Sequence, residues 1–252
     1  MVLHDPRPDP EDISIPVPRV RKGDAVTLTV AVPVFGPPAA GKTTLTARLS
    51  KAPATAVFRL REHVPTTILA ATATSAERLG WIDDFTVIAT LRAYLEDLVT
   101  AGGTGTVIFD NFPGNAAQVR HFLAALRQTA PGCAVVAVEL TVNVTTLYRR
   151  AYHRRVCHRC ERDPIRDPRL PAEARADDPQ RCARCGGILH PRRGDAPRLL
   201  RARLQRYRQT ADGIKEAFAG GGVTVHALDS GTTPEDTAQA VTALLTARSS
   251  PA

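Results

Sequence analysis

Lysine, cysteine and long apolar runs are all scarce in this sequence. Only four of the 33 basic residues are lysines, and five cysteines in 252 residues are too few for a fold built on disulfides. No apolar run approaches the roughly 18 residues that a membrane-spanning helix needs. The N-terminus has no basic-then-apolar signal pattern, so we expect a cytoplasmic protein with no membrane partner. The apolar fraction of 43% is still enough to form a folded core.

Positive charge is concentrated in one part of the chain. The segment from Arg149 to Arg208 contains 18 arginines, no lysine and 7 acidic residues, which gives it a net charge of +11. The whole chain carries +8, so the remainder is slightly acidic. We therefore expect an anionic ligand or partner at this segment.

Short apolar runs alternate with helical patterns along most of the chain. The predicted strands, rich in β-branched residues, are 26–35, 106–110, 134–140 and 223–228. The predicted helices are 44–51, 117–129, 145–155, 199–218 and 234–247. This alternation predicts an α/β fold with a parallel sheet flanked by helices. Residues 1–26 are rich in proline and charge without periodicity, which indicates a flexible tail.

A phosphate-binding loop follows the first predicted strand. Residues 36–43 read Gly-Pro-Pro-Ala-Ala-Gly-Lys-Thr, a complete Walker A pattern. In such a loop, backbone N–H groups wrap the phosphates, Lys42 reaches the outer phosphates and the Thr43 hydroxyl holds Mg²⁺. Asp110 ends a later apolar strand, where an acid that orders Mg²⁺ or its waters is expected. The sequence therefore predicts a nucleotide site that uses ATP with Mg²⁺.

Two Cys-x-x-Cys pairs predict a metal site. Cys157 and Cys160 are separated from Cys182 and Cys185 by 21 residues, and four thiolates at this spacing suit tetrahedral Zn²⁺. The segment between the pairs is too polar to bury a core, so a metal ion would supply the missing stability. Nothing indicates an open coordination position, so we expect the zinc to be structural. The alternative is a set of unpaired or redox-active thiols.

Five motifs follow one another along the chain. They are Gly36-Pro-Pro-x-x-Gly-Lys42, Asp110-Asn-Phe-Pro113, Arg154-Arg-Val-Cys157, Arg192-Arg-Gly-Asp195 and Arg203-Leu-x-x-Tyr207. Together they resemble the adenylate kinase and nucleoside monophosphate kinase family, in the variant with a zinc-bound LID. The resemblance implies a P-loop NTPase-type core at 27–155 and 195–252, an inserted acceptor-binding segment at 58–84 and a zinc LID at 156–194.

The resemblance also implies a role for individual residues. The residues expected to bind ATP are Gly36, Gly41, Lys42, Thr43, Thr44, Arg150 and Arg154, with Arg150 against the base. The residues expected to act in phosphoryl transfer are Lys42, Asp110, Arg154, Arg192 and Arg203. Phosphoryl transfer depends on positioning and positive charge more than on covalent chemistry, which accounts for so many arginines.

The acceptor side departs from the family's pattern. Pro65 and Gly114 stand where the family has arginines that bind the acceptor phosphate. We expect nearby arginines to replace them, and a glutamine after the Asp110 motif to read the base as it does in the family. The predicted acceptor-binding residues are Arg59, Arg61 and Gln118.

Three functions compete on this sequence. The first is phosphoryl transfer from ATP to AMP or another nucleoside monophosphate, by a monomer whose LID closes over the substrates. The second keeps the ATP site but takes a modified nucleotide or another small phosphorylated or phosphonylated metabolite as the acceptor. The third is a nucleic-acid-binding ATPase with a basic zinc ribbon, but the arginine-rich segment has few aromatic residues that could stack on bases.

Overall fold

The core of the protein is a parallel β-sheet with the strand order β2-β3-β1-β5-β8, in which the short β4 also pairs with β1. The computed structural model describes residues 27–74, 81–161 and 168–249, so the predicted tail at 1–26 lies outside the described residues. The strands are β1 (Val30–Phe35), β2 (Thr55–Phe58), β3 (Thr106–Asp110), β4 (Ala134–Val135), β5 (Ala137–Thr141) and β8 (Val225–Asp229). The pairings among these strands are all parallel, which confirms the predicted fold class.

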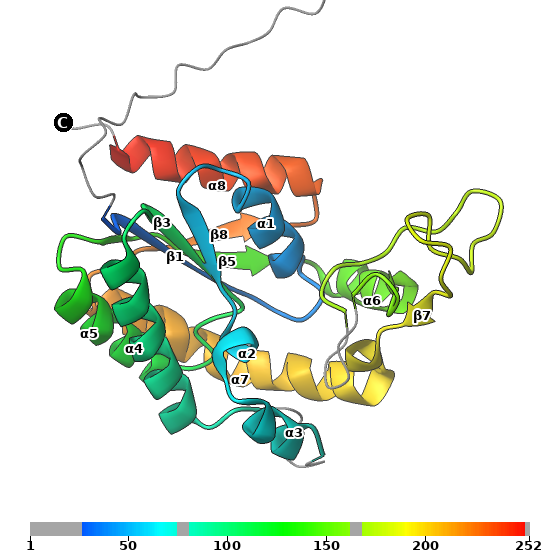
Figure 1. Cartoon of the computed structure of the whole chain (residues 1–252), viewed down its shortest axis with the longest axis horizontal. Helices are drawn as coiled ribbons and strands as arrows, with labels where there is room; N and C mark the ends of the chain where they lie inside the picture. Colours follow the sequence, from blue (N-terminus) through cyan, green and yellow to red (C-terminus); the bar gives the residue numbers. More distant parts are fainter. Residues whose placement is uncertain (1–26, 75–80, 162–167, 250–252) are drawn as a thin grey trace, which may run out of the picture.

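Helices cover both faces of the sheet (Figure 1). On one face lie α1 (Lys42–Leu49) and α8 (Pro234–Ser249), and on the other lie α4 (Asp84–Ala101), α5 (Ala116–Thr129) and α7 (Pro197–Gly220). Side chains of β1 alternate between the two layers. Val32 and Val34 pack in the cluster with α1, whereas Ala31 and Phe35 pack in the cluster with α4, α5 and α7. This two-residue alternation within one apolar run is what a strand buried on both faces requires.

Several predicted boundaries differ from those in the structure. The first strand begins at Val30 rather than at residue 26, and residues 27–29 have no regular structure. The predicted strand 134–140 is divided at Val136, although the Val136 N–H still donates to the Ala31 carbonyl at 2.9 Å. Neither β2 nor the 18-residue helix α4 was predicted from the sequence. Both lie close to the segment predicted to be inserted, where short apolar runs are hard to separate from a variable insertion.

Two short helices form the segment between β2 and α4, which we name the acceptor segment (58–84). They are α2 (Leu60–His63) and α3 (Thr66–Thr74), and residues 75–80 lie outside the described residues. α4 then begins at an N-cap in which Asp83 accepts a hydrogen bond from the Thr86 N–H at 2.9 Å. This arrangement carries the chain out beyond the end of β2 and brings it back at α4 (Figure 1).

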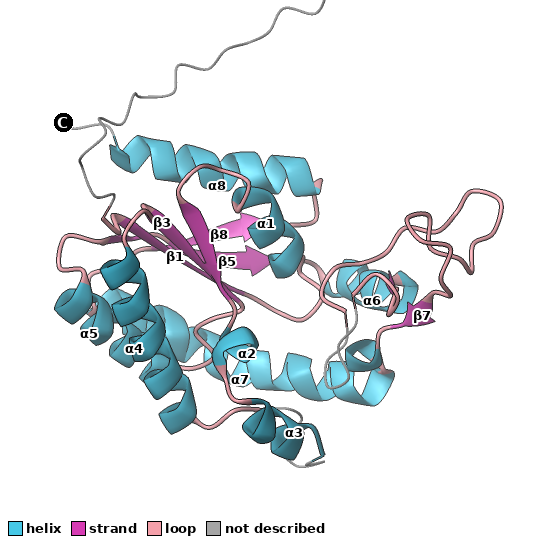
Figure 2. Ribbon diagram, in the orientation of Figure 1, coloured by secondary structure: helices cyan, strands magenta, loops and turns pink. Residues whose placement is uncertain are grey.

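The second excursion from the core is the segment that we name the LID (156–194). It leaves α6 (Val144–His153) through β6 (Arg155–Val156) and returns through the antiparallel β7 (His190–Pro191) and a single 3-10 turn (Arg193–Asp195) to α7. Most of the segment is loop (Figure 2). Among its described residues, 156–161 and 168–194, the buried apolar cluster is small and gathers around the cysteines. No helix in the described part of the chain is long and apolar enough to cross a bilayer.

Candidate active site

The phosphate loop joins β1 to α1 and depends on two glycines. Gly36 has a φ of +146°, and a Cβ at this position would lie 2.5 Å from the Leu140 carbonyl oxygen. Gly41 has a φ of +93° and forms the N-cap of α1. A side chain at Gly36 would collide with a neighbouring strand, and one at Gly41 would strain the turn into the helix. The predicted loop is therefore present, with the N-terminus of α1 at its end.

Lys42 is buried at the base of the loop, with 8% of its surface exposed. Its Nζ donates hydrogen bonds to the carbonyls of Gly36 at 2.8 Å and Pro37 at 2.7 Å. Burial is the main cause that lowers the pKa of Lys42 to about 7, and the positive charge of Arg203 is the next. A neutral amine keeps two N–H groups, which is enough for both bonds. Lys42 is thus held in place in either protonation state.

Thr43 and Asp110 lie together beside the loop. The Thr43 hydroxyl donates to Asp110 Oδ1 at 3.4 Å, and the Asp110 side chain is only 6% exposed. A hydroxyl and a carboxylate are oxygen ligands of the kind that Mg²⁺ takes alongside nucleotide phosphates. These two residues therefore fit a magnesium ion that arrives with the nucleotide. Thr44 follows Thr43 in α1 and lines the same cavity as Thr43 and Asp110, which is described below.

The three predicted transfer arginines lie around the loop. Arg154 forms a two-pronged ion pair with Asp195, at 2.6 Å from both Nε and Nη2. Arg203 donates to the Gly194 carbonyl at 3.0 Å, and burial together with the charge of Arg192 lowers the pKa of Arg203 to about 10. All three arginines also lower the pKa of Lys42, so their charges act on the same point. The structure thus brings together four cations that are widely separated in the sequence.

Arg150 of α6 contacts the turn that follows β8. Its Nη2 donates to the Ser230 carbonyl at 2.6 Å, in the turn between β8 and α8. Desolvation lowers its pKa. The guanidinium plane is therefore fixed at the wall of the cavity, which is compatible with the base contact expected for it.

Arg59 and Arg61, the two arginines expected to bind the acceptor, lie in different surroundings. Arg59 Nε is 3.4 Å from Asp110 Oδ2, and Arg59 Nη1 is 3.7 Å from Glu62. Arg61 comes close enough to Arg203 to lower the pKa of that arginine. The charge of Arg61 therefore acts on one of the cations around Lys42, and Arg59 is engaged by two carboxylates.

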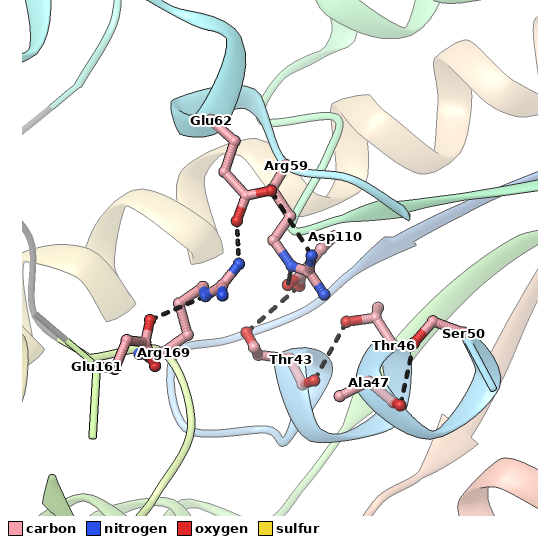
Figure 3. Close-up of polar contacts among 9 residues, drawn as sticks. All are labelled: Thr43, Thr46, Ala47, Ser50, Arg59, Glu62, Asp110, Glu161 and Arg169. Atoms are coloured by element: carbon pink, nitrogen blue, oxygen red, sulfur yellow. Dashed lines mark hydrogen bonds and ion pairs between the residues drawn. The ribbon is translucent and has the colours of Figure 1, made fainter. Parts of the chain in front are cut away.

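A line of polar contacts runs from the phosphate loop to the LID (Figure 3). It passes from Thr43 through Asp110 and Arg59 to Glu62, which forms an ion pair with Arg169 of the LID. Arg169 in turn pairs with Glu161 at 2.9 Å. The acceptor segment and the LID thus touch each other across the mouth of the site.

Gln118, predicted to contact a base, is buried with 3% of its surface exposed. Its Nε2 donates to Asp84 Oδ1 at 2.7 Å, and its Oε1 accepts from the Gly114 N–H at 2.8 Å. Asn115 Nδ2 donates to the same carboxylate at 3.0 Å. The amide of Gln118 is therefore committed to the start of α4, and a contact with a base would compete with these bonds.

The sequence analysis did not identify the wall formed by Trp81, Gly114 and Arg206. A Cβ at Gly114 would lie 2.6 Å from Cη2 of Trp81, so the indole occupies the space that any side chain at 114 would need. The guanidinium carbon of Arg206 lies 4.8 Å from the centroid of the same ring. The signal in the sequence was the combination of Gly114 in the place of an arginine with the only tryptophan of the chain.

One continuous cavity of about 1410 Å³ connects these groups. Its walls come from the phosphate loop, α2, the loop after β3, the start of the LID and one face of α7. The volume exceeds the upper end of the ~300–1,000 Å³ range that is usual for a single small-molecule site. The cavity is therefore large enough for two ligands side by side.

The four cysteines of the LID form a cluster in which all sulfur atoms lie within 4.8 Å of one another. The Cys157 and Cys185 sulfurs are 3.4 Å apart, and those of Cys160 and Cys182 are 3.7 Å apart. A tetrahedral zinc ion with Zn–S bonds of ~2.3 Å requires sulfur separations of about 3.8 Å. The Gly187 N–H also points at the Cys185 sulfur at 3.4 Å, as a donor to a thiolate does. The cluster therefore fits a structural zinc ion held by these four residues.

The sheet, the phosphate loop and the helix that follows it define a P-loop NTPase-type protein. The family described as AAA domain matches residues 32–166, which is more than half of the chain, and the chain belongs to this family. The matched region contains the phosphate loop, Asp110, Arg150 and Arg154. The family includes kinases, so the site is a nucleotide-binding, kinase-like one. A search among curated proteins found no match.

Proposed function

We propose that this protein transfers the γ-phosphoryl group of ATP to a nucleoside monophosphate, giving ADP and a nucleoside diphosphate. The observation that carries the proposal is the convergence of Arg154, Arg192 and Arg203 on Lys42 at the centre of a two-ligand cavity. So many cations in one desolvated place repel one another, and a polyphosphate would relieve that repulsion. The resemblance to the adenylate kinase family supports the same reaction.

In this reaction an ionised phosphate oxygen of the acceptor attacks the γ-phosphorus. The bond from that phosphorus to the oxygen bridging to the β-phosphate breaks, and the bridging oxygen leaves as part of ADP. The acceptor oxygen carries no proton, so the protein needs no general base. Lys42 and the three arginines hold the negative charge of the transferring group, which is the main contribution that enzymes make to this chemistry.

Each ligand takes one side of the cavity in this proposal. Gly36, Gly41 and the N-terminus of α1 bind the ATP phosphates, with Arg150 against the base and Thr44 beside the phosphates. Thr43 and Asp110 hold Mg²⁺, directly or through water. The ion neutralises charge on the β- and γ-phosphates when it is bound. The acceptor segment (58–84) holds the second substrate, with Arg61 directed toward its phosphate.

The LID (156–194) excludes water when it closes over ATP. Water would otherwise accept the phosphoryl group, so closure protects the reaction. The zinc ion keeps this loop-rich segment folded, and the contact between Arg169 and Glu62 brings it to the acceptor segment. The core domain at 27–155 and 195–252 then remains the rigid base of both excursions.

A second acceptor class is favoured by one observation. The indole of Trp81 fills the space where the adenylate kinase family carries an acceptor-binding arginine. A modified nucleotide, or another small phosphorylated or phosphonylated metabolite, is therefore the alternative acceptor. The nucleic-acid alternative is disfavoured, because several LID arginines are paired with acids of the same segment, as Arg175 is with Asp177.

The proposal is tested by measuring product formation from ATP and a panel of AMP, GMP, CMP and UMP, with separation of the nucleotides by chromatography. With AMP we expect two ADP for each ATP consumed, and with another monophosphate equal amounts of ADP and the new diphosphate. The Lys42→Ala variant should form either product far more slowly. Release of inorganic phosphate and ADP from ATP, with the added monophosphate left unconsumed, would contradict the proposal. Stimulation of ATP hydrolysis by DNA or RNA would favour the nucleic-acid alternative instead.

A further inference from the structure

The cavity wall that contains Trp81 and Gly114 has a cation that no family motif accounts for. Arg206 projects from α7, and its guanidinium lies over the Trp81 ring at 4.8 Å. Among the residues that the structure describes, it forms no ion pair with a carboxylate. A half-buried guanidinium on an aromatic face, facing a cavity, is free to bind an anion with its edge while its plane stays on the ring.

The position of this cation follows from Gly114. An arginine at 114 would direct its side chain along the Cβ direction, where the Trp81 ring now lies. The guanidinium of Arg206 lies on that same ring. Arg206 therefore supplies a positive charge on the part of the cavity wall where Gly114 has none. The departure from the family pattern at Gly114 and the position of Trp81 are thus linked by one steric relation.

The helix places Arg206 at a suitable distance from the transfer centre. Arg203 and Arg206 are three residues apart on α7, so they lie on one face with Cβ atoms about 5–6 Å apart. Arg203 belongs to the cations around Lys42, and Arg206 lies one turn farther from the LID. Tyr207 fixes this turn, because its hydroxyl donates to Glu139 of β5 at 2.5 Å. An acceptor phosphate next to the γ-phosphate of ATP would lie within reach of both arginines.

We propose that Arg206, oriented by the Trp81 indole, binds the phosphate of the acceptor and replaces the arginine that is missing at Gly114. This inference rests on the proposed function and deepens it, because it identifies a second anchor for the acceptor besides Arg61. Trp81 is a positioning residue in this arrangement. It orients the guanidinium plane of Arg206 and does not contact the acceptor itself.

The single tryptophan of the chain makes this site directly observable. Binding of a nucleoside monophosphate to Arg206 changes the surroundings of the indole, so the fluorescence of the protein reports acceptor binding without ATP. We would titrate AMP, GMP, CMP and UMP, and the four nucleosides without phosphate, into the parent, Arg206→Gln and Arg208→Gln. Arg208 is exposed on the same helix and does not line the cavity, which makes it the matched control.

We expect a saturable change with at least one monophosphate, and a dissociation constant that is roughly tenfold to a hundredfold higher in Arg206→Gln than in the parent and in Arg208→Gln. In turnover, the acceptor KM rises by the same factor while the KM for ATP stays within about twofold of the parent value. Arg206→Lys keeps the positive charge but not the planar guanidinium. Its dissociation constant for the monophosphate should therefore lie between those of the parent and Arg206→Gln. Trp81→Phe retains most of the affinity in turnover, whereas Trp81→Leu loses part of it.

The results separate this inference from the proposed function. Equal acceptor affinity in Arg206→Gln and the parent would overturn the role of Arg206, even if the protein proves to be a nucleoside monophosphate kinase. Absence of turnover with every monophosphate would refute the proposed function. In that case an Arg206-dependent fluorescence change would still support the anion site, and the lack of any change would overturn it. Thermal unfolding of each variant checks that the fold is retained.

Discussion

The two sides of the cavity are built by different means. On the side of the phosphate loop, the site is mostly backbone, since Gly36 and Gly41 let the loop wrap close to β5 and start α1. On the side of Trp81, the wall is made of side chains held by contacts across the fold, as the Trp81 ring packs against the Gly114 backbone and Gln118 donates to Asp84. A backbone site tolerates little change in its sequence. A side-chain wall can replace one binding group with another, which is what we propose for Gly114 and Arg206.

The largest effect is expected from Lys42→Ala, which removes a charge at the point where both sides meet. We expect kcat to fall by at least about 10²–10³-fold, because a preorganised group that stabilises charge in the transition state is lost. Steady-state kinetics measures this, with Lys51→Ala as the control because Lys51 is exposed after α1. A variant that keeps near-normal turnover would show that Lys42 has no role in transfer.

Loss of the LID metal is expected to have the next largest effect. We expect about one Zn²⁺ per chain in the parent, and Cys182→Ser should lose it. The variant should also unfold at a lower temperature in its first transition and be less active. Elemental analysis of reduced, unchelated protein measures the metal. Cys133→Ala serves as the control, because Cys133 is outside the cluster and should leave the zinc content unchanged. Parent protein without metal would refute the zinc site.

Arg61 and Arg59 provide a direct comparison within the acceptor segment. Arg61→Gln should raise the acceptor KM by roughly tenfold to a hundredfold, because a charge-assisted hydrogen bond to a phosphate is worth ~1.5–3 kcal/mol. Arg59→Gln should affect the acceptor less, since Arg59 is engaged by Asp110 and Glu62. The exposed Arg92 of α4 supplies a neutral control as Arg92→Gln. If Arg59→Gln raised the acceptor KM more than Arg61→Gln, the prediction would be wrong, and the ion pairs of Arg59 would have to open on binding.

The lowered pKa of Lys42 predicts a pH dependence. With a pKa of about 7, Lys42 is half neutral at pH 7, and ATP favours its charged form. ATP binding should therefore take up a fraction of a proton, and affinity should fall about fivefold between pH 7 and pH 8. Calorimetry in buffers of different ionisation enthalpy measures the uptake, and Lys42→Met corrects for protons released by ATP itself. Equal proton exchange in both proteins would place the pKa of Lys42 outside this range.

The same pKa sets the sign of a stability effect. In the unfolded chain Lys42 titrates near its ordinary value of 10.5, so between pH 7 and that value the unfolded state binds more protons than the folded state. The contribution of Lys42 to the stability of the ligand-free protein therefore increases as the pH rises through this window. Denaturant unfolding of the parent and Lys42→Met across the window isolates the contribution.

The contact between the two excursions should have the smallest effect. Glu62 and Arg169 are partly exposed, and exposed ion pairs contribute about 0.2–1 kcal/mol. Arg169→Gln should therefore change either KM by less than about fivefold, with less effect at high salt. Arg181→Gln, which removes an ion pair inside the LID, is the control. A larger change would mean that LID closure depends on this pair.

Local patterns were sufficient for much of this molecule. The strand-loop-helix signature around Gly36 and Lys42 predicted the phosphate loop, because its geometry is set by residues adjacent in the chain. The alternation of buried strands and helices predicted the parallel sheet for the same reason. The cysteine spacing predicted a cluster whose sulfur atoms do lie together. In each case the residues concerned are either close together in the sequence or repeated at a regular spacing.

The acceptor wall depended on contacts that no local pattern encodes. Trp81 and Gly114 are linked by a steric fit across 33 positions of the chain, and Arg206 joins them from α7. The tertiary structure alone shows that Gln118 is committed to Asp84, and that Arg61 lies near Arg203 while Arg59 pairs with Asp110. The sequence by itself determined the residue types, the phosphate loop and the class of fold. Tertiary packing decided which charges face the cavity, because each side chain's partners come from distant elements brought together by the sheet.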